Sequence, residues 1–337
     1  MFRKVSRRAA RFSVFLAVVL FCASAGIAAE PIKIAMLKQP GVAPLFIAQE
    51  KGYFAAEGLQ AELVYLESGQ AIAVAVASGD IDFGAVGVSG GFYNLAGQGV
   101  LKIIAGSYRE AAGFPVFGVV ASNKAYAAGF RSYKDLPGRS IAVTAVGSAG
   151  HYTLALIAEK FGVDLKTVHV LPTQSITNAV TAVSGGSADG GVQLANVTVT
   201  MMDNGSCKLI GWAGEDVPWQ LATIFTASKI ANDKRDMVER FLRAYRKGSQ
   251  DYHDAFIGPD GKRKDGPTAP AMLALIGKYV NQPVDQVSRS ISYNDAEGRL
   301  DVKDVLHQIE WYRAQGMVKG DFAPASVIDQ RFVKPMP

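Results

Sequence analysis

The feature that most constrains the fold is a sequence pattern that occurs twice. The first copy, AVAVASGDIDFG, covers residues 73–84, and the second, AVTAVSGGSADGG, covers residues 179–191. Each copy predicts a helix of small residues, a tight glycine turn, an aspartate and a strand. Asp82 and Asp189 lie 107 positions apart, which is too long for a solenoid repeat and indicates two related lobes with a ligand cleft between them. We interpret the two aspartates as turn-stabilising side chains in equivalent positions, not as an acid/base pair.

The first 29 residues predict a cleaved signal peptide. Five basic residues precede an apolar run at 12–22, and small residues follow at 23–29. This order is typical of an export signal, and the run is shorter than the roughly 20 residues that a membrane-spanning helix needs. The chain is therefore expected in the periplasm, with cleavage near Ala28 or Ala29.

The composition of the remaining chain excludes several classes of function. Residues 1–29 hold five of the 35 Lys and Arg residues and none of the 30 acidic ones, so the mature chain has 30 of each and is formally neutral. Nucleic acid is not an expected partner, because phosphate binding needs a basic patch. Only Cys207 remains after cleavage, which excludes an internal disulfide. The four histidines are scattered, so we expect neither a metal site nor a cofactor.

The order of the predicted elements indicates an α/β fold. Strands alternating with helices are typical of βαβ units, and about 308 residues permit two domains. We predict a first lobe from residues 30–116 and 226–337, a second lobe from residues 117–225, and a hinge where the chain crosses twice. The predicted strands lie at 32–37, 59–66, 81–86, 101–105, 117–121, 141–145, 168–171, 191–194 and 221–227.

Several motifs in the expected order resemble one family. They are IAQEKGYF at 47–54, SGDIDFG at 78–84, DLPGR at 135–139, GSAGH at 147–151 and QIEWY at 308–312. Together they resemble periplasmic solute-binding proteins of ABC importers, in the NMT1/SsuA-like class that takes sulfonates, nitrate, taurine and thiamine precursors. The resemblance implies a type II periplasmic-binding-protein fold with no enzymatic activity. It also implies a monomer that binds a small molecule and docks on an inner-membrane ABC permease with its ATPase.

Two predicted helix starts are the main candidates for ligand binding. Gly147-Ser148 follows a strand in the second lobe, and Ser68-Gly69-Gln70 is its first-lobe counterpart; backbone N–H groups at such positions bind anions. Arg109 is expected to add a positive charge, and the ligand body is expected to pack on Phe114 or Trp212. His151 is expected either to donate to the anion or to pack in its helical turn. The further candidates are Gln39, Gly41, Val88, Ser89, Gln193 and Asn196.

The residues leave the ligand and one alternative function open. Where sulfonate binders carry an aromatic-acidic-proline segment, this chain has VQLAN at 192–196, which favours a carboxylate, aromatic carboxylates included, over an alkanesulfonate. Residues 87–91, GVSGG, match G-x-S-x-G and raise the alternative of a secreted serine hydrolase with Ser89 as nucleophile. A pyrimidine-precursor binder or synthase of the same fold is the other alternative, and the signal peptide disfavours the intracellular synthase.

Overall fold

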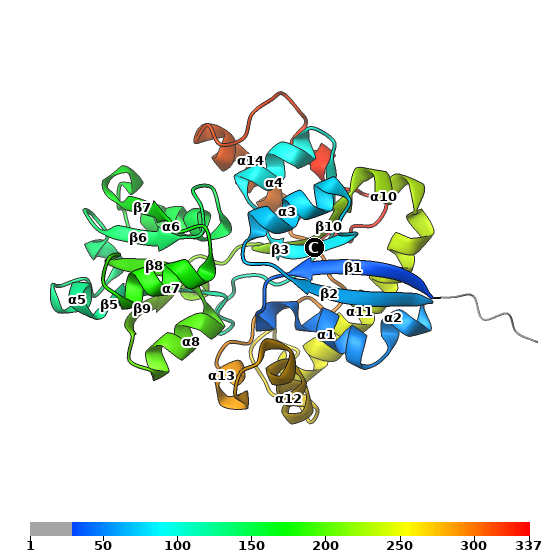
Figure 1. Cartoon of the computed structure of the whole chain (residues 1–337), viewed down its shortest axis with the longest axis horizontal. Helices are drawn as coiled ribbons and strands as arrows, with labels where there is room; N and C mark the ends of the chain where they lie inside the picture. The colour runs from blue at the N-terminus through cyan, green and yellow to red at the C-terminus, as the bar shows by residue number, and fades with distance from the viewer. Residues whose placement is uncertain (1–28) are drawn as a thin grey trace, which may run out of the picture.

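The computed structural model describes residues 29–337 and has two lobes, each built on one five-stranded sheet (Figure 1). The second lobe lies on the left of that view and the first lobe on the right. Residues 1–28, most of the predicted signal peptide, lie outside the described residues. The predicted α/β class and the two-lobed arrangement are confirmed.

The first sheet has the strand order β2–β1–β3–β10–β4, with β1, β2 and β3 parallel and β10 antiparallel to both of its neighbours. The second sheet repeats this arrangement in the order β7–β6–β8–β5–β9. The antiparallel strand carries a register shift in both sheets, in β10 and in β5. The two lobes therefore share one topology. The strands are β1 Glu30–Met36, β2 Leu59–Tyr65, β3 Phe83–Gly87, β4 Leu101–Gly106, β5 Phe117–Ser122, β6 Ser140–Val143, β7 His169–Pro172, β8 Gly190–Leu194, β9 Cys207–Trp212 and β10 Ala222–Ala227.

The duplicated sequence pattern occupies equivalent positions in the two lobes. Asp82 precedes β3, and its Oδ2 accepts a hydrogen bond from the backbone N–H of Lys33 at 2.8 Å. Asp189 precedes β8, and its Oδ2 accepts one from the backbone N–H of Ser140 at 2.9 Å. Each carboxylate thus ties the start of one strand to its parallel neighbour. The interpretation of both aspartates as structural groups is confirmed.

The chain crosses between the lobes after β4 and again after β9. The crossing segments pair with each other through backbone hydrogen bonds between Glu110 and Trp219. The predicted boundary at Phe225 falls inside β10, which belongs to the first sheet, so we propose that the second lobe ends just before Ala222. Strand β9 is absent from the predicted strands, because its residues alternate only weakly between polar and apolar.

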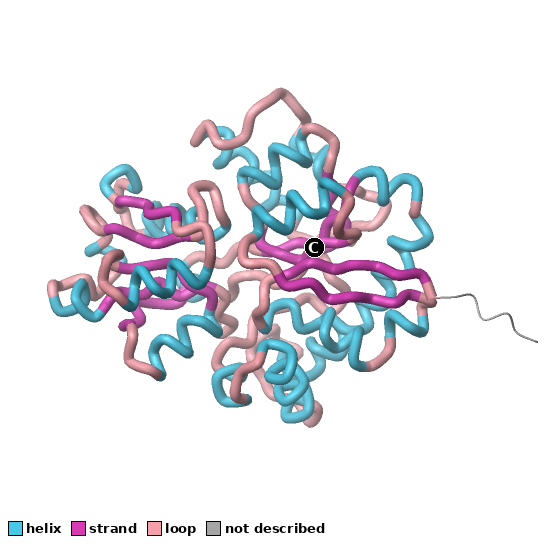
Figure 2. The backbone as a smooth tube through the Cα atoms, in the orientation of Figure 1, coloured by secondary structure: helices cyan, strands magenta, loops and turns pink. Residues whose placement is uncertain are grey.

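Helices cover both faces of the first sheet, with α3 and α4 on one side and α1 and α11 on the other (Figure 2). The long helix α11 buries Phe241, whose ring stacks on Phe83 of β3 at 3.9 Å between centroids. Helix α14 places Trp311 and Tyr312 against Tyr152 of the second lobe, at 5.0 and 5.7 Å. The C-terminal part of the chain therefore packs against both lobes. The helices are α1 Ala43–Glu50, α2 Tyr53–Ala56, α3 Gly69–Ser78, α4 Gly90–Gly97, α5 Asn123–Ala127, α6 Ala149–Lys160, α7 Ile176–Ser184, α8 Ala195–Asp203, α9 Ala213–Asp216, α10 Ser228–Asp233, α11 Arg235–Phe256, α12 Ala269–Val280, α13 Val284–Ser288 and α14 Val302–Ala314.

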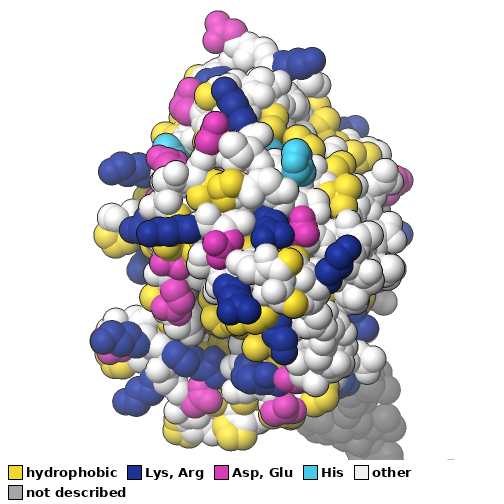
Figure 3. Space-filling model, turned by 90° about the vertical axis from the view of Figure 1, so that its left-hand side faces the viewer, with side chains coloured by type: hydrophobic (Ala, Val, Ile, Leu, Met, Phe, Trp, Pro, Cys, Tyr) yellow, Lys and Arg dark blue, Asp and Glu magenta, His cyan; other side chains and the backbone are white. Residues whose placement is uncertain are grey.

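The surface of the second lobe mixes charges of both signs. On the face shown in Figure 3, Lys and Arg side chains are interspersed with Asp and Glu side chains. Within residues 29–337, no helix is long and apolar enough to cross a membrane. The same residues contain no cluster of three or more His, Cys, Asp or Glu side chains placed to hold a metal ion.

Candidate ligand-binding cleft

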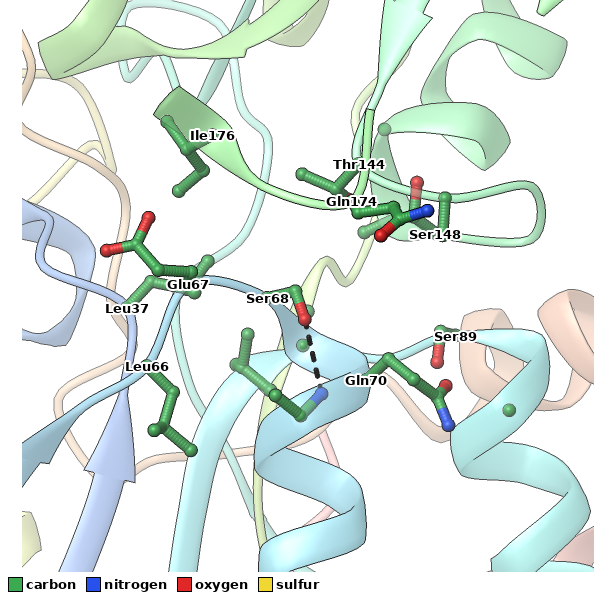
Figure 4. Close-up of a pocket in the computed structure, with 18 of the residues that line it drawn as sticks. Leu37, Leu66, Glu67, Ser68, Gln70, Ser89, Thr144, Ser148, Gln174 and Ile176 are labelled. Atoms are coloured by element: carbon green, nitrogen blue, oxygen red, sulfur yellow. Dashed lines mark hydrogen bonds between the residues drawn. The ribbon is translucent and has the colours of Figure 1, made fainter. Parts of the chain in front are cut away.

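A cavity of about 790 Å³ lies between the two lobes. Its wall includes the residues that directly follow parallel strands, namely Leu37 and Leu66 in the first lobe and Thr144 in the second. The carboxyl ends of parallel strands are the usual ligand-binding edge of an α/β sheet. Figure 4 shows side chains of the two lobes facing each other across this space.

Four serine-capped helices begin around the cavity, two from each lobe. The hydroxyl oxygens of Ser68, Ser89 and Ser148 accept hydrogen bonds from backbone N–H groups in the first turns of α3, α4 and α6, at 3.2, 3.1 and 3.3 Å. Ser175 caps α7 in the same way at 3.1 Å. Short polar side chains are favoured at this position because they satisfy N–H groups that have no partner inside the helix. The positive ends of four helix dipoles thus meet at one space, which favours a negative charge there.

The ionised side chains at the cavity are acidic. Glu67 and Asp80 line it, both are exposed, and none of the described residues that line it is Lys or Arg. An anion in the cavity would therefore be neutralised by backbone N–H groups and helix dipoles alone. A second negative charge near the mouth would be repelled by the two carboxylates.

Two residues that line the cavity each carry a buried polar group without a protein partner. The hydroxyl of Tyr108 and the Nε2 of Gln193 find no hydrogen-bond partner among residues 29–337, and their residues are 0% and 2% exposed. Burial raises the pKa of Tyr108, so its hydroxyl keeps its proton and can donate. Buried polar groups are nearly always paired. Both atoms have almost no accessible surface, so they lie just behind the wall of the cavity and not on it.

The rest of the wall is largely apolar. Val74 of the first lobe and Val146 of the second line the cavity and are 51% and 54% exposed, which is unusual for large aliphatic side chains. Leu37, Leu66 and Ile176 also line it (Figure 4). The exposed apolar surface suits a ligand with a hydrocarbon or aromatic body.

Gln174 lines the cavity in a strained backbone conformation. Its φ is +67°, and Asn281 is the other non-glycine residue with a positive φ in the described part of the chain. Its N–H donates to the carbonyl of Thr144 at 2.8 Å, which fixes the loop before Ser175. Backbone strain of this kind concentrates at functional sites.

The two lobes are in direct contact on both sides of the cavity. On one side the backbone N–H of Gly90 donates to the carbonyl of Gly147 at 3.0 Å. On the other side the amide of Asn196 in α8 donates to the carbonyl of Lys38 at 3.4 Å and to Gln282 at 3.2 Å. The structure therefore holds the lobes together around the cavity.

Half of the predicted site residues line the cavity. They are Ser68, Gly69, Gln70, Ser89, Gly147, Ser148 and Gln193. The lining residues that the sequence did not predict include Leu37, Leu66, Glu67, Val74, Tyr108, Thr144, Val146, Gln174 and Ile176. The usable signal for several of these was their position just after a predicted parallel strand.

Arg109 is a correction, because its side chain points away from the cleft. It lies in a separate pocket, 3.7 Å from the carboxylate of Asp301 and with a hydrogen bond to the sulfur of Met336 at 2.9 Å. Successive side chains of an extended segment point to opposite sides. Since Tyr108 lines the cavity, its neighbour Arg109 faces the other way.

The two aromatic residues expected to contact the ligand, Phe114 and Trp212, do not line this cavity. Phe114 is 1% exposed and packs edge to face on Tyr293 at 5.5 Å. Trp212 lines a different pocket, beside Met202 and Arg289. Neither aromatic ring is among the residues that line the cavity.

Four other predicted residues lie next to the cleft without lining it. The side chain of Gln39 accepts a hydrogen bond from the N–H of Gly41 at 2.8 Å, and Gly41 packs so closely on Tyr108 that a Cβ there would lie 2.7 Å from the ring. Val88 is buried and bonded through its N–H to Leu221. Asn196 joins the lobes as described above.

His151 is 5% exposed and does not line the cavity. Its Nδ1 accepts a hydrogen bond from the N–H of Gly147 at 3.0 Å. Of the two expectations for this residue, packing in the first helical turn is therefore confirmed.

Comparison with solved structures places the fold. The chain is similar to the alkanesulfonate-binding protein SsuA from Xanthomonas axonopodis pv. citri bound to MOPS, with 17% identity, a TM-score of 0.70, and coverage of 89% of this chain and 99% of that one. It is similar to the Candida albicans CA3427 product, which has the generic periplasmic binding protein fold. The identity is 16%, the TM-score is 0.71, and the match covers 91% of this chain and 98% of that one. It is also similar to the periplasmic nitrate-binding protein NrtA from Synechocystis PCC 6803. Here the identity is 14%, the TM-score is 0.65, and the match covers 86% of this chain and 83% of that one.

These identities are low, so the similarities establish the periplasmic-binding-protein fold and not the ligand. No curated protein sequence matches the chain. The profile of the family described as NMT1/THI5 like matches residues 39–255, which is more than half of the chain and includes both copies of the duplicated pattern. The resemblance inferred from the sequence motifs is thereby confirmed, and the chain belongs to the NMT1/THI5-like family.

Proposed function

We propose that this protein is an exported receptor that captures a small organic anion in the cleft between its lobes and delivers it to an ABC permease. The observation that carries the proposal is the convergence of helix starts from both lobes on one cavity, where their backbone N–H groups are available. All of these groups donate hydrogen bonds, so the matching ligand group is an acceptor with negative charge.

The cavity supports a singly charged ligand with an apolar body. A volume of about 790 Å³ greatly exceeds that of a nitrate ion, and Val74, Val146 and Ile176 offer aliphatic surface. Glu67 and Asp80 disfavour a second negative charge. SsuA binds alkanesulfonates and NrtA binds nitrate. The size and apolar wall of the cavity favour an organic anion over nitrate, and this anion is either a carboxylate or a sulfonate.

A ligand panel tests the proposal on the mature chain. Thermal shift and calorimetry with benzoate, benzenesulfonate, nitrate and a neutral aminopyrimidine should show binding of an aromatic anion in preference to the other two. A ligand that binds only the native state raises the melting temperature. Tighter binding of the aminopyrimidine would favour the pyrimidine-precursor alternative and overturn the anion assignment.

Serine caps provide a matched pair of variants for this test. Ser148→Ala removes a cap at the cavity and should weaken anion binding about tenfold. Ser122→Ala removes the equivalent cap of α5, where the hydroxyl accepts from the N–H of Ala125 at 3.1 Å, outside the cavity. Equal effects of the two variants on affinity would contradict a ligand at the α6 start.

We further propose that Ser89 is a cap and cleft residue and that the protein has no hydrolase activity. The Ser89 oxygen accepts from the N–H of Phe92, and the Nδ1 of His151 already accepts from Gly147. A serine nucleophile needs a histidine within hydrogen-bond reach as general base, and the described residues show no such bond to Ser89. A fluorophosphonate probe should leave the protein unlabelled, and stoichiometric labelling of Ser89 would restore the hydrolase alternative.

The predicted signal peptide and the family membership support export and docking on a permease. The mature N-terminus should lie near Ala28 to Glu30. Mass spectrometry of the periplasmic fraction would show it directly, and a cytoplasmic product that retains Met1 would contradict the assignment.

A further inference from the structure

One glycine at the cleft connects a buried histidine to the contact between the lobes. The N–H of Gly147 donates to Nδ1 of His151 at 3.0 Å, and the carbonyl of the same residue accepts from the N–H of Gly90 in the first lobe at 3.0 Å. Gly147 has a φ of +78°, a conformation that glycine adopts without strain. Any change in the loop that carries Gly147 therefore reaches the bond that joins the lobes.

The bond from Gly147 requires a neutral histidine. An imidazole nitrogen accepts a hydrogen bond only when it carries no proton, so the ring holds its proton on Nε2. Protonation of Nδ1 would place two N–H donors against each other and leave the buried N–H of Gly147 without an acceptor.

From this geometry we infer that His151 is a positioning residue, which keeps the Gly147 loop in the conformation that closes the two lobes over the ligand. Closure of the cleft then depends on the protonation state of a residue that does not touch the ligand. The inference rests on the proposed function insofar as the closed cleft is taken to hold a ligand. Acid should loosen the closed form and weaken binding.

The surroundings of His151 are consistent with a neutral ring. Burial lowers its pKa below the ordinary value, and Trp311 of α14 packs edge to face on it at 5.8 Å. The charged side chains that share its pocket are Glu159 of α6 with Asp164 and Lys166 beside it. Because the folded-state pKa is lowered, the ring is still neutral at the ordinary histidine pKa of about 6.5, and the bond is lost only as the pH falls through the lowered folded-state pKa.

Amide hydrogen exchange tests the inference without any ligand. The protection factors of the Gly147 and Gly90 amides, corrected for intrinsic exchange, should fall about tenfold in the wild type between about pH 7.5 and a pH about one unit below the folded-state pKa of His151. In His151→Asn, Oδ1 takes the place of Nδ1 and does not titrate, so protection should persist at both pH values. In His151→Leu, which has no acceptor, protection should be low at both.

His169 provides the matched control, because it is an exposed histidine on β7 of the same lobe. His169→Asn should behave as the wild type does. The inference is overturned if His151→Leu keeps wild-type protection at about pH 7.5, or if His151→Asn loses protection in acid as the wild type does.

Calorimetry with benzenesulfonate, which stays ionised throughout this pH range, tests whether His151 affects ligand binding. The dissociation constant of the wild type should rise about tenfold between about pH 7.5 and a pH about one unit below the folded-state pKa of His151, whereas that of His151→Asn should stay constant. If benzenesulfonate and benzoate both fail to bind, the ligand class of the proposed function is wrong, and the exchange experiment still decides the role of His151. A wild-type affinity that is independent of pH, despite loss of amide protection, would overturn the link between His151 and closure.

Discussion

Closure of the cleft can be tested by adding a single methyl group where the lobes touch. Gly87 ends β3 in the first lobe, and a Cβ built on it would lie 2.9 Å from the Cβ of Ala149 at the start of α6 in the second lobe. The backbone of Gly87 is not in the left-handed region, so alanine introduces no conformational strain. Gly87→Ala therefore acts mainly through this contact.

The size of the effect follows from the overlap. Carbon atoms in contact lie about 3.5–4.0 Å apart, so the lobes must separate here by about 0.6 Å or more. The same Cβ would lie 2.9 Å from Cδ2 of Leu221, the end of a flexible side chain that can move aside. Overpacking of this kind costs about 1–3 kcal/mol, and when it falls on the closed form alone it weakens ligand binding about 5- to 150-fold.

Calorimetry with the tightest-binding anion of the panel measures this loss, and urea unfolding of the ligand-free protein measures stability. Gly118→Ala is the control, because Gly118 does not line the cavity and a Cβ there would lie 2.9 Å from Thr198 and Trp212, both in the same lobe as Gly118. We expect Gly87→Ala to lose affinity with little loss of ligand-free stability, and Gly118→Ala to lose ligand-free stability with little loss of affinity. Equal affinities of the two variants would refute the closed-lobe reasoning.

Arg109→Ala should leave anion affinity within about twofold of wild type in calorimetry, because its side chain faces a separate pocket; a tenfold loss would return it to the cleft. Gln174→Gly should raise the free energy of unfolding in urea by about 1 kcal/mol by relieving a positive φ while weakening ligand binding, whereas Asn281→Gly, outside the cavity, should leave binding unchanged. Burial raises the pKa of Glu110 to about 8, although its carboxylate accepts hydrogen bonds from the N–H groups of Val116 and Phe117. The folded state therefore retains a proton that the unfolded state releases, so the free energy of unfolding should fall as the pH rises from about 5 to about 8. The same pH dependence of the free energy of unfolding in Glu110→Gln would contradict this assignment.

Local sequence signals predicted the lobes and the helix starts. The repeated turn with Asp82 and Asp189 identified two related units, because a carboxylate that bonds a neighbouring strand needs the same short spacing in each copy. Ser68 and Ser148 were identifiable because a helix N-terminus has N–H groups that a nearby short side chain satisfies. Both signals depend on residues a few positions apart, which is why the sequence alone contains them.

Tertiary structure decided which side chains line the cleft and which contacts join its two lobes. The sequence suggested Arg109 as the positive charge that binds the anion, yet the crossing segment turns Tyr108 and not Arg109 toward the cavity. The neighbouring residues in the sequence do not indicate which side of an extended segment faces the cavity. The pairing of Gly147 with His151 on one side and with Gly90 on the other joins residues of different lobes. The sequence alone determined the two-lobed α/β fold and its serine-capped helices, because these arise from short-range patterns. Only the packing of the lobes decided which side chains face the ligand, because that depends on how distant strands and crossing segments are oriented.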